Sequence, residues 1–185
     1  FLEGIPGTLG GALRMNAGAM GWETFDLVDW VSFLLPDGSI REIPGTDLEV
    51  GYRYCREAYD GIALRAKLKS DGRSDHRAIR KVIEKLASQR RATQPREASA
   101  GCIFRNPDDE SAGLLIDQAG LKGEREGAAV VSDLHANFII NEGGASAEEV
   151  ISLIKRVRER VKESKGMMLE PEVGILGHSW KEFLS

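Results

Sequence analysis

The residues with the clearest chemical potential lie in one short segment near the middle of the chain, around Cys102. This segment reads Ser99-Ala100-Gly101-Cys102-Ile103-Phe104-Arg105-Asn106-Pro107. A thiol placed between a glycine turn and a cation could donate a proton, or act as a nucleophile if its pKa were lowered. Most cysteines are simply small buried hydrophobic residues, so residue types alone favour a structural role for Cys102. Arg105 likewise has the alternative of a solvated surface cation.

Two further charged residues could assist such chemistry. Glu172 opens an apolar segment, where desolvation could raise its pKa and keep it protonated, although an exposed glutamate is the commoner case. Arg53 lies between Tyr52 and Tyr54, which is typical either of a cation stacked on aromatic rings or of a clamp for a substrate carboxylate. The residues themselves leave both alternatives open.

The amino-terminal segment from Gly4 to Gly21 contains six glycines. Such density indicates backbone at positive φ or in close approach to another group. Its first part is not a Walker loop, because no Gly-Lys-Ser/Thr follows, and it is not a Rossmann fingerprint, because no strand precedes it. By composition a purely structural turn is favoured over a backbone cradle for a cofactor.

Composition and charge pattern restrict the class of partner. The chain has 185 residues, of which 42% are hydrophobic, so it can bury a substantial core. The net charge of -4 comes from 25 basic and 29 acidic residues that are interspersed along the sequence. We therefore expect a small-molecule partner, with no nucleic acid and no membrane.

Cysteine and histidine usage indicates no metal site. Cys55 and Cys102 have neither metal-ligand spacing nor the number needed for a disulfide framework, so a reducing cytosol is the expected location. The histidines at 76, 135 and 178 show no i, i+4 pairing. The sequence also lacks a run of about 20 apolar residues and a signal peptide at its start, and we expect a cytoplasmic protein.

Secondary structure in the first half is predicted from apolar patterns and turn residues. Residues 27–35 and 40–43 predict a hairpin, because the Pro36-Asp37-Gly38-Ser39 turn lies between them. Residues 62–68 predict a further strand. Ser74 can cap a following helix that ends near Gln94-Pro95 and has an apolar face of Ile79, Val82, Ile83 and Leu86. A boundary between two parts is expected near residue 92.

The second half predicts shorter elements and one long helix. A helix over 111–119 and strands over 128–131 and 137–140 are expected. Ser146 and Glu149 match a capping box, and apolar residues recur at helical spacing from there to Gly166. Pro171 excludes a helix at its position, and residues 173–176 predict a final strand.

These segments occur in one order and spacing that resembles the UDP-N-acetylenolpyruvoylglucosamine reductase family. Six ordered motifs carry the resemblance over nearly the whole chain. They are Gly4-Ile5-Pro6-Gly7-Thr8-Leu9-Gly10-Gly11-Ala12 with Met15-Asn16-Ala17-Gly18-Ala19, Gly51-Tyr52-Arg53, the Cys102 segment, Ala119-Gly120-Leu121-Lys122-Gly123, Val131-Ser132-Asp133-Leu134-His135-Ala136-Asn137-Phe138, and Leu169-Glu170-Pro171-Glu172-Val173.

The resemblance implies an α/β (α+β) fold. Residues 1–91 would form the second half of an FAD-binding domain of the vanillyl-alcohol-oxidase type, with 167–185 returning to it, and residues 92–166 a small α/β substrate-binding domain. By motif, the resemblance assigns catalysis to Arg53, Cys102 and Glu172, FAD binding to Ile5, Pro6, Gly7, Gly10, Gly11, Asn16 and Gly18, and substrate binding to Arg105 and Asn106. Most relatives have serine at 102 and lysine at 105.

The activity that the resemblance implies is the FAD-dependent, NADPH-driven reduction of UDP-N-acetylglucosamine enolpyruvate to UDP-N-acetylmuramate. This is a step of peptidoglycan synthesis, and so of cell-wall biogenesis, cell shape and cell division. A further lobe of the same polypeptide, with another glycine-rich loop for FAD, precedes the corresponding segment in the family. The 185 residues alone are therefore expected to bind FAD weakly and to be inactive. Another FAD-dependent oxidoreductase of the superfamily and a non-catalytic binding or scaffold module are the alternatives.

Overall fold

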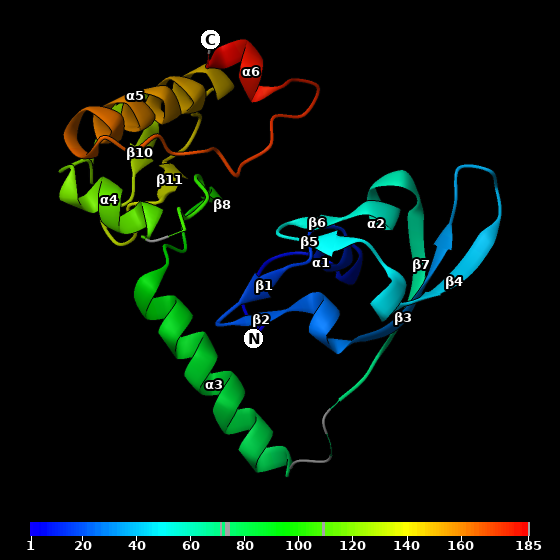
Figure 1. The fold of residues 1–185 in the computed structure, drawn as a ribbon. Coiled ribbons are helices and arrows are strands. Elements are labelled where there is room, and N and C mark those ends of the chain that lie inside the picture. Colours follow the sequence, from blue (N-terminus) through cyan, green and yellow to red (C-terminus); the bar gives the residue numbers. More distant parts are fainter. Residues whose placement is uncertain (71, 73–74, 109, 185) are drawn as a thin grey trace. The chain divides into compact units, whose positions relative to one another are not determined.

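The computed structural model describes residues 1–70, 72, 75–108 and 110–184 (Figure 1). The chain forms two compact units, Phe1–Arg90 and Arg91–Ser185. Each unit combines helices with small antiparallel sheets, which confirms the predicted α/β class.

A three-stranded sheet forms the centre of the first unit. Its order is β4-β3-β7, with β3 at Val28–Leu34, β4 at Ile40–Pro44 and β7 at Ile62–Leu68. The predicted hairpin and the predicted strand at 62–68 are confirmed. The hairpin turn has Gly38 at φ 80° and an Asp37 carboxylate that accepts a 2.9 Å hydrogen bond from the Ser39 backbone N–H. Glycine reaches this φ without a steric cost, and the aspartate replaces a backbone acceptor.

Short elements surround this sheet and complete the first core. They are α1 (Leu9–Arg14), β1 (Gly18–Ala19), β2 (Trp22–Glu23), η1 (Thr24–Leu27), η2 (Gly45–Asp47), β5 (Val50–Gly51), β6 (Tyr54–Cys55) and α2 (Arg56–Asp60). The core cluster consists of Leu13, Val28, Val31, Phe33, Leu48, Cys55 and Ala58. Sequence analysis did not predict α1, because its glycines indicate a turn. The Thr8 side chain nevertheless caps it by accepting a 3.1 Å hydrogen bond from the Gly11 N–H.

The predicted long helix is α3, at His76–Thr93. Its expected cap, Ser74, lies outside the described residues. All of α3 is described and none of its residues is buried; Ile79, Val82 and Ile83 of the predicted apolar face are exposed. Near its end, Arg90 Nε donates to the Glu3 carbonyl at 3.1 Å and Arg90 Nη2 to the Phe1 carbonyl at 3.3 Å. These bonds hold the start of the glycine-rich segment.

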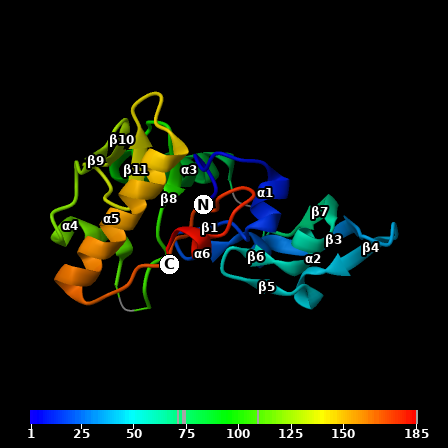
Figure 2. The ribbon, with the colours of Figure 1, turned by 90° about the horizontal axis from the view of Figure 1, so that it is seen from above.

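The second unit is built on a four-stranded antiparallel sheet with two helices against it. The sheet order is β8-β11-β10-β9, with β8 at Ser99–Cys102, β9 at Arg125–Glu126, β10 at Ala129–Val131 and β11 at Phe138–Asn141. Helix α4 (Ala112–Gln118) packs on α5 (Ala147–Lys165), and α5 contacts β9 and β10. Both views of the ribbon show α5 beside β10 (Figures 1 and 2). The predicted helices and the two predicted strands of this half are confirmed within one residue at most ends.

Helix α5 follows its sequence signals closely. Ser146 Oγ accepts from the Glu149 N–H at 3.1 Å, and Glu149 Oε2 accepts from the Ser146 N–H at 3.0 Å, which confirms the capping box. Gly166 ends the helix at φ 70°. The buried face consists of Leu153, Ile154, Val157 and Val161.

The carboxy-terminal segment differs from the sequence prediction in its secondary structure. The predicted strand at 173–176 is wrong: the segment makes one isolated bridge, Phe104 with Pro171, and then turns at Gly177, leaving Leu176 98% exposed. The residues after α5 belong to the second compact unit, where Leu169 is a core residue. Trp180 packs against the same core and donates from Nε1 to the Val173 carbonyl at 2.6 Å. The last helix, α6, spans Trp180–Phe183.

Replacing Leu153 by alanine should lower the free energy of unfolding by about 2–5 kcal/mol, because this α5 side chain is 0% exposed in the second core. Urea unfolding followed by circular dichroism measures the loss. Leu176→Ala removes the same atoms from an exposed site and should change stability by less than about 0.5 kcal/mol. Equal losses for the two variants would contradict the described packing.

Candidate functional site

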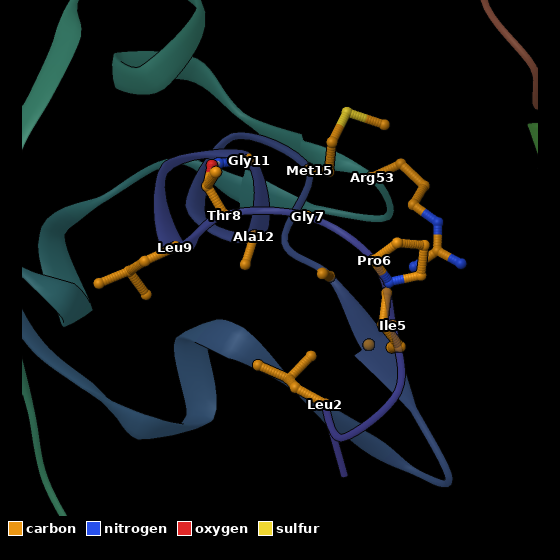
Figure 3. A pocket seen from close by; sticks show the side chains of 12 residues that line it. Leu2, Ile5, Pro6, Gly7, Thr8, Leu9, Gly11, Ala12, Met15 and Arg53 are labelled. Carbon is orange, nitrogen blue, oxygen red and sulfur yellow. The ribbon is translucent and has the colours of Figure 1, made fainter. Parts of the chain in front are cut away.

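A pocket of about 590 Å³ lies in the first unit, at the glycine-rich segment (Figure 3). Its lining is mostly apolar, with one cation. The lining residues are Leu2, Ile5, Pro6, Gly7, Thr8, Leu9, Gly11, Ala12, Met15, Ala17, Gly18 and Arg53. A concave, mainly apolar pocket of this size with few polar groups is typical of a small-molecule or cofactor site.

The pocket wall depends on backbone that only glycine forms easily. Gly4 lies at φ 78° and Gly7 at φ 150°, and the chain then enters α1 through the Thr8 cap. At Gly18, an added Cβ would come within 2.9 Å of the Trp22 carbonyl oxygen across the β1–β2 pair. The glycines that sequence analysis noted therefore shape the wall of the pocket.

The expected cofactor residues divide into two groups in the structure. Five of them, Ile5, Pro6, Gly7, Gly11 and Gly18, line the pocket, whereas Gly10 and Asn16 do not. Asn16 is buried, and its Nδ2 donates to Glu23 Oε2 at 2.6 Å and to the Gly51 carbonyl at 3.2 Å. Asn16 thereby ties the end of α1 to the hairpin that carries Arg53.

Arg53 occupies a strained position at the edge of this pocket. It lies in the two-residue loop between β5 and β6 and has φ 54°, a left-handed conformation that is uncommon for a residue with a side chain. Its Cζ lies 5.0 Å from the centre of the Tyr52 ring, so the cation stacks on an aromatic face. Figure 3 shows the side chain extending toward the Ile5 and Pro6 side of the pocket, where its charge can act on an anion.

Cys102 and Glu172 lie in the second unit, where backbone pairing brings them together. Cys102 ends β8 opposite Phe138 of β11. The Glu172 N–H donates to the Ile103 carbonyl at 2.7 Å, and the Arg105 N–H donates to the Glu170 carbonyl at 2.9 Å. Both Cys102 and Glu172 are half-buried. A thiol and a carboxyl group that are distant in sequence thus belong to neighbouring segments.

The two expected substrate residues follow directly after this pairing. Arg105 and Asn106 are exposed. Asn106 Oδ1 accepts a 3.0 Å hydrogen bond from the Ala112 N–H, which fixes the loop before α4. The structure therefore places both residues beside the Cys102 segment on the surface of the second unit.

Burial distinguishes the two cysteines. Cys55 is 0% exposed in the first core, and burial raises the pKa of its thiol. Burial also lowers the pKa of His135, with a smaller contribution from nearby Lys122.

Over the described ranges, no group of three or more His, Cys, Asp or Glu side chains could hold a metal ion. No helix within the part of the chain that the structure describes is long and apolar enough to span a bilayer.

Sequence reasoning missed Thr8, Ala12 and Met15, which line the pocket. Together with the expected Gly11 they recur at i, i+3, i+4 and i+7, which is one face of a helix. A prediction of α1 would have placed all four on the same side. The glycines concealed this pattern.

Comparison with known proteins is consistent with the fold and the site. Residues 94–176 match the family model described as "UDP-N-acetylenolpyruvoylglucosamine reductase, C-terminal domain". The fold and this match define the class of the protein: an α/β chain whose second unit is the carboxy-terminal domain of a reductase family. The crystal structure of the reductase from Thermus caldophilus superposes with a TM-score of 0.78 at 39% identity, covering 93% of this chain and 62% of that chain.

Similarity to curated relatives extends over almost all of the chain. The UDP-N-acetylenolpyruvoylglucosamine reductase of Alkalilimnicola ehrlichii is 46% identical over 180 residues, 97% of this chain and 60% of the relative. That of Alkaliphilus oremlandii is 42% identical over 179 residues, 96% of this chain and 59% of the relative. The chain belongs to the UDP-N-acetylenolpyruvoylglucosamine reductase family, and it spans about three fifths of the length of these relatives.

Iodoacetamide should modify Cys102 faster than Cys55 in the folded chain at neutral pH. Cys55 is inaccessible, and its raised pKa leaves less of the reactive thiolate at that pH. Peptide mass spectrometry over time measures both rates. Cys102→Ser should abolish the fast modification and retain the slow one, whereas equal rates at the two cysteines would contradict the described burial.

Proposed function

We propose that the protein is a flavoenzyme that uses NADPH to reduce UDP-N-acetylglucosamine enolpyruvate to UDP-N-acetylmuramate, a cytoplasmic step of peptidoglycan precursor synthesis. The observation that carries this proposal is the similarity to curated UDP-N-acetylenolpyruvoylglucosamine reductases over 97% of this chain. The first unit would take part in FAD binding and the second in substrate binding. An FAD-binding lobe upstream of these residues in the family would complete the cofactor site.

The pocket of the first unit fits part of a flavin. It is largely apolar, as suits an aromatic ring system, and its wall presents backbone through Ile5, Pro6, Gly7, Gly11 and Gly18. Gly10 and Asn16 would support that wall. When bound, FAD supplies the hydride that NADPH provides.

The proposed reaction requires stabilisation of negative charge on the substrate. Hydride addition to the terminal carbon of an enolpyruvyl ether leaves negative charge on the adjacent carbon and its carboxylate. Arg53 and Glu172 would act on this charge as it develops, and stabilising it there lowers the barrier more than equal binding of the substrate would. The proposal assigns both residues to one reaction.

Cys102 would complete the reaction by donating a proton from its thiol to that adjacent carbon. A thiol with a reference pKa of about 8.5 is mostly protonated at neutral pH and so holds its proton before each turnover. Arg105 and Asn106, on the surface beside Cys102, would donate hydrogen bonds to the substrate diphosphate.

The complete gene product that contains this chain should oxidise NADPH only when UDP-N-acetylglucosamine enolpyruvate is present, and the purified protein should show the visible absorption of oxidised flavin. Absorbance at the NADPH band measures turnover. The 185 residues expressed alone should show neither property. A colourless complete gene product, or steady turnover of an unrelated alcohol without this substrate, would contradict the proposed function.

In the same protein, Cys102→Ala should slow substrate reduction by about 10²- to 10⁴-fold while flavin reduction by NADPH remains nearly unchanged. The reason is that only the second half-reaction needs a proton on carbon. Stopped-flow absorbance separates the two half-reactions. Cys102→Ser should retain much of the rate, since a hydroxyl can also donate a proton, and equal slowing of both half-reactions would remove Cys102 from the mechanism.

A further inference from the structure

The backbone of Phe104 lies between two segments and is buried. Phe104 is 1% exposed and pairs with Pro171 in the isolated bridge. The hydrogen bonds of this bridge come from the flanking residues, since Ile103 accepts from Glu172 and Arg105 donates to Glu170. In this type of antiparallel pair the N–H and C=O of Phe104 itself point away from the 170–172 segment. They therefore need partners on the opposite side.

Asn137 supplies those partners with its side-chain amide. Its Oδ1 accepts from the Phe104 N–H at 2.9 Å, and its Nδ2 donates to the Phe104 carbonyl at 2.8 Å. The Asn137 backbone carbonyl also accepts from the Ile103 N–H at 2.9 Å. Asn137 is 2% exposed, so these bonds form away from water. The side-chain amide thus makes the two hydrogen bonds that a peptide group of a neighbouring strand would make, just before β11 begins.

A tight turn between β10 and β11 orients Asn137. The Ser132 Oγ accepts from the N–H groups of Leu134 and His135 at 3.2 and 3.3 Å. The His135 Nδ1 accepts from the Asn137 N–H at 3.2 Å. An accepting Nδ1 carries no proton, and the lowered pKa of His135 favours this neutral ring. These side-chain bonds act together with backbone bonds of the same turn, in which the Phe138 N–H donates to the His135 carbonyl at 2.9 Å and the Ser132 N–H to the Phe138 carbonyl at 2.9 Å.

We propose that Asn137 is a positioning residue, which holds the Cys102 segment against the 170–172 segment so that the thiol and the Glu172 carboxyl keep a fixed geometry. This inference rests on the proposed function of Cys102 and Glu172. Cys102 lies two residues before Phe104, and the Glu172 N–H binds the Ile103 carbonyl between them. The Asn137 side chain thus bonds the backbone of Phe104, and backbone hydrogen bonds and the chain itself connect Phe104 to Cys102 and Glu172.

The amide is the chemical group that this position requires. It presents one acceptor and one donor at the spacing of a peptide group, which matches the N–H and C=O of Phe104. A serine side chain is shorter and has a single oxygen, so it does not reach both backbone groups as the two-atom amide does. An aspartate retains the acceptor but places a second oxygen against the Phe104 carbonyl. Both replacements leave a buried backbone group without this partner, although they perturb it differently.

The test compares Asn137→Ser with the matched change Asn141→Ser in the 185-residue chain. Asn141 ends the strand β11 that Asn137 precedes, but it is exposed, and its Oδ1 accepts from the N–H groups of Gly143 and Ala145. Asn137→Ser should accelerate hydrogen exchange of the Phe104 and Glu172 amides and raise the rate of Cys102 alkylation at least several-fold relative to Cys55. Asn141→Ser should change neither. A parallel rise at Cys55 would signify global unfolding and would contradict local positioning.

The kinetic test uses the complete gene product. Asn137→Ser should lower kcat for substrate reduction by about 10²-fold, the size of effect that a misplacement of about 1 Å can cause, with flavin reduction by NADPH unchanged. If this variant does not fold, Asn137→Asp takes its place. Loss of folding in both variants, or normal exchange and kinetics in a folded one, would overturn the inference. The exchange and alkylation results do not depend on any activity, so they separate failure of this inference from failure of the proposed function.

Discussion

The segment Cys102–Arg105 pairs on both of its edges, and the arrangement of the second unit depends on this pairing. On one side it bonds to residues 170–172, and on the other side to Asn137. Buried N–H and C=O groups must find partners, and this requirement brings three segments that are distant in sequence into register. The α5 helix and the core around Leu153 hold the sheet behind them. The segments that carry the half-buried Cys102 and Glu172 side chains are neighbours as a result.

A different constraint acts in the first unit. The shape of its pocket depends on left-handed backbone conformations and not on hydrogen bonds between strands. Glycines at positive φ let the chain turn into α1 without a steric penalty, and Arg90 and Asn16 hold the two ends of that segment by hydrogen bonds to backbone carbonyls. Arg53 adopts a left-handed conformation in the β5–β6 loop beside the same pocket. Strained residues of this kind often occur at functional sites, since the surrounding structure must fix them.

Local sequence signals succeeded where the deciding interactions are local. The capping box and apolar spacing of α5, the Asp37-Gly38 turn and the strand at 62–68 all involve neighbours within a few residues. The predicted strand at 173–176 is wrong because Val173 and Glu172 bond to Ile103, a partner that no local pattern reveals. Helix α1 was missed because glycine content suggested a turn, whereas the Thr8 cap and tertiary packing of Leu13 support a helix.

The sequence by itself determined the family, the α/β class and the identity of the candidate residues, because six ordered motifs are readable without coordinates. It could not decide whether Arg53 stacks on an aromatic ring or clamps a substrate carboxylate. The structure places this cation over the Tyr52 ring at the edge of a pocket. Nor could it show that Asn16 bonds the Gly51 carbonyl, or that Asn137 bonds both backbone groups of Phe104. Those roles depend on hydrogen bonds between distant segments, and only tertiary structure determines which distant segments meet.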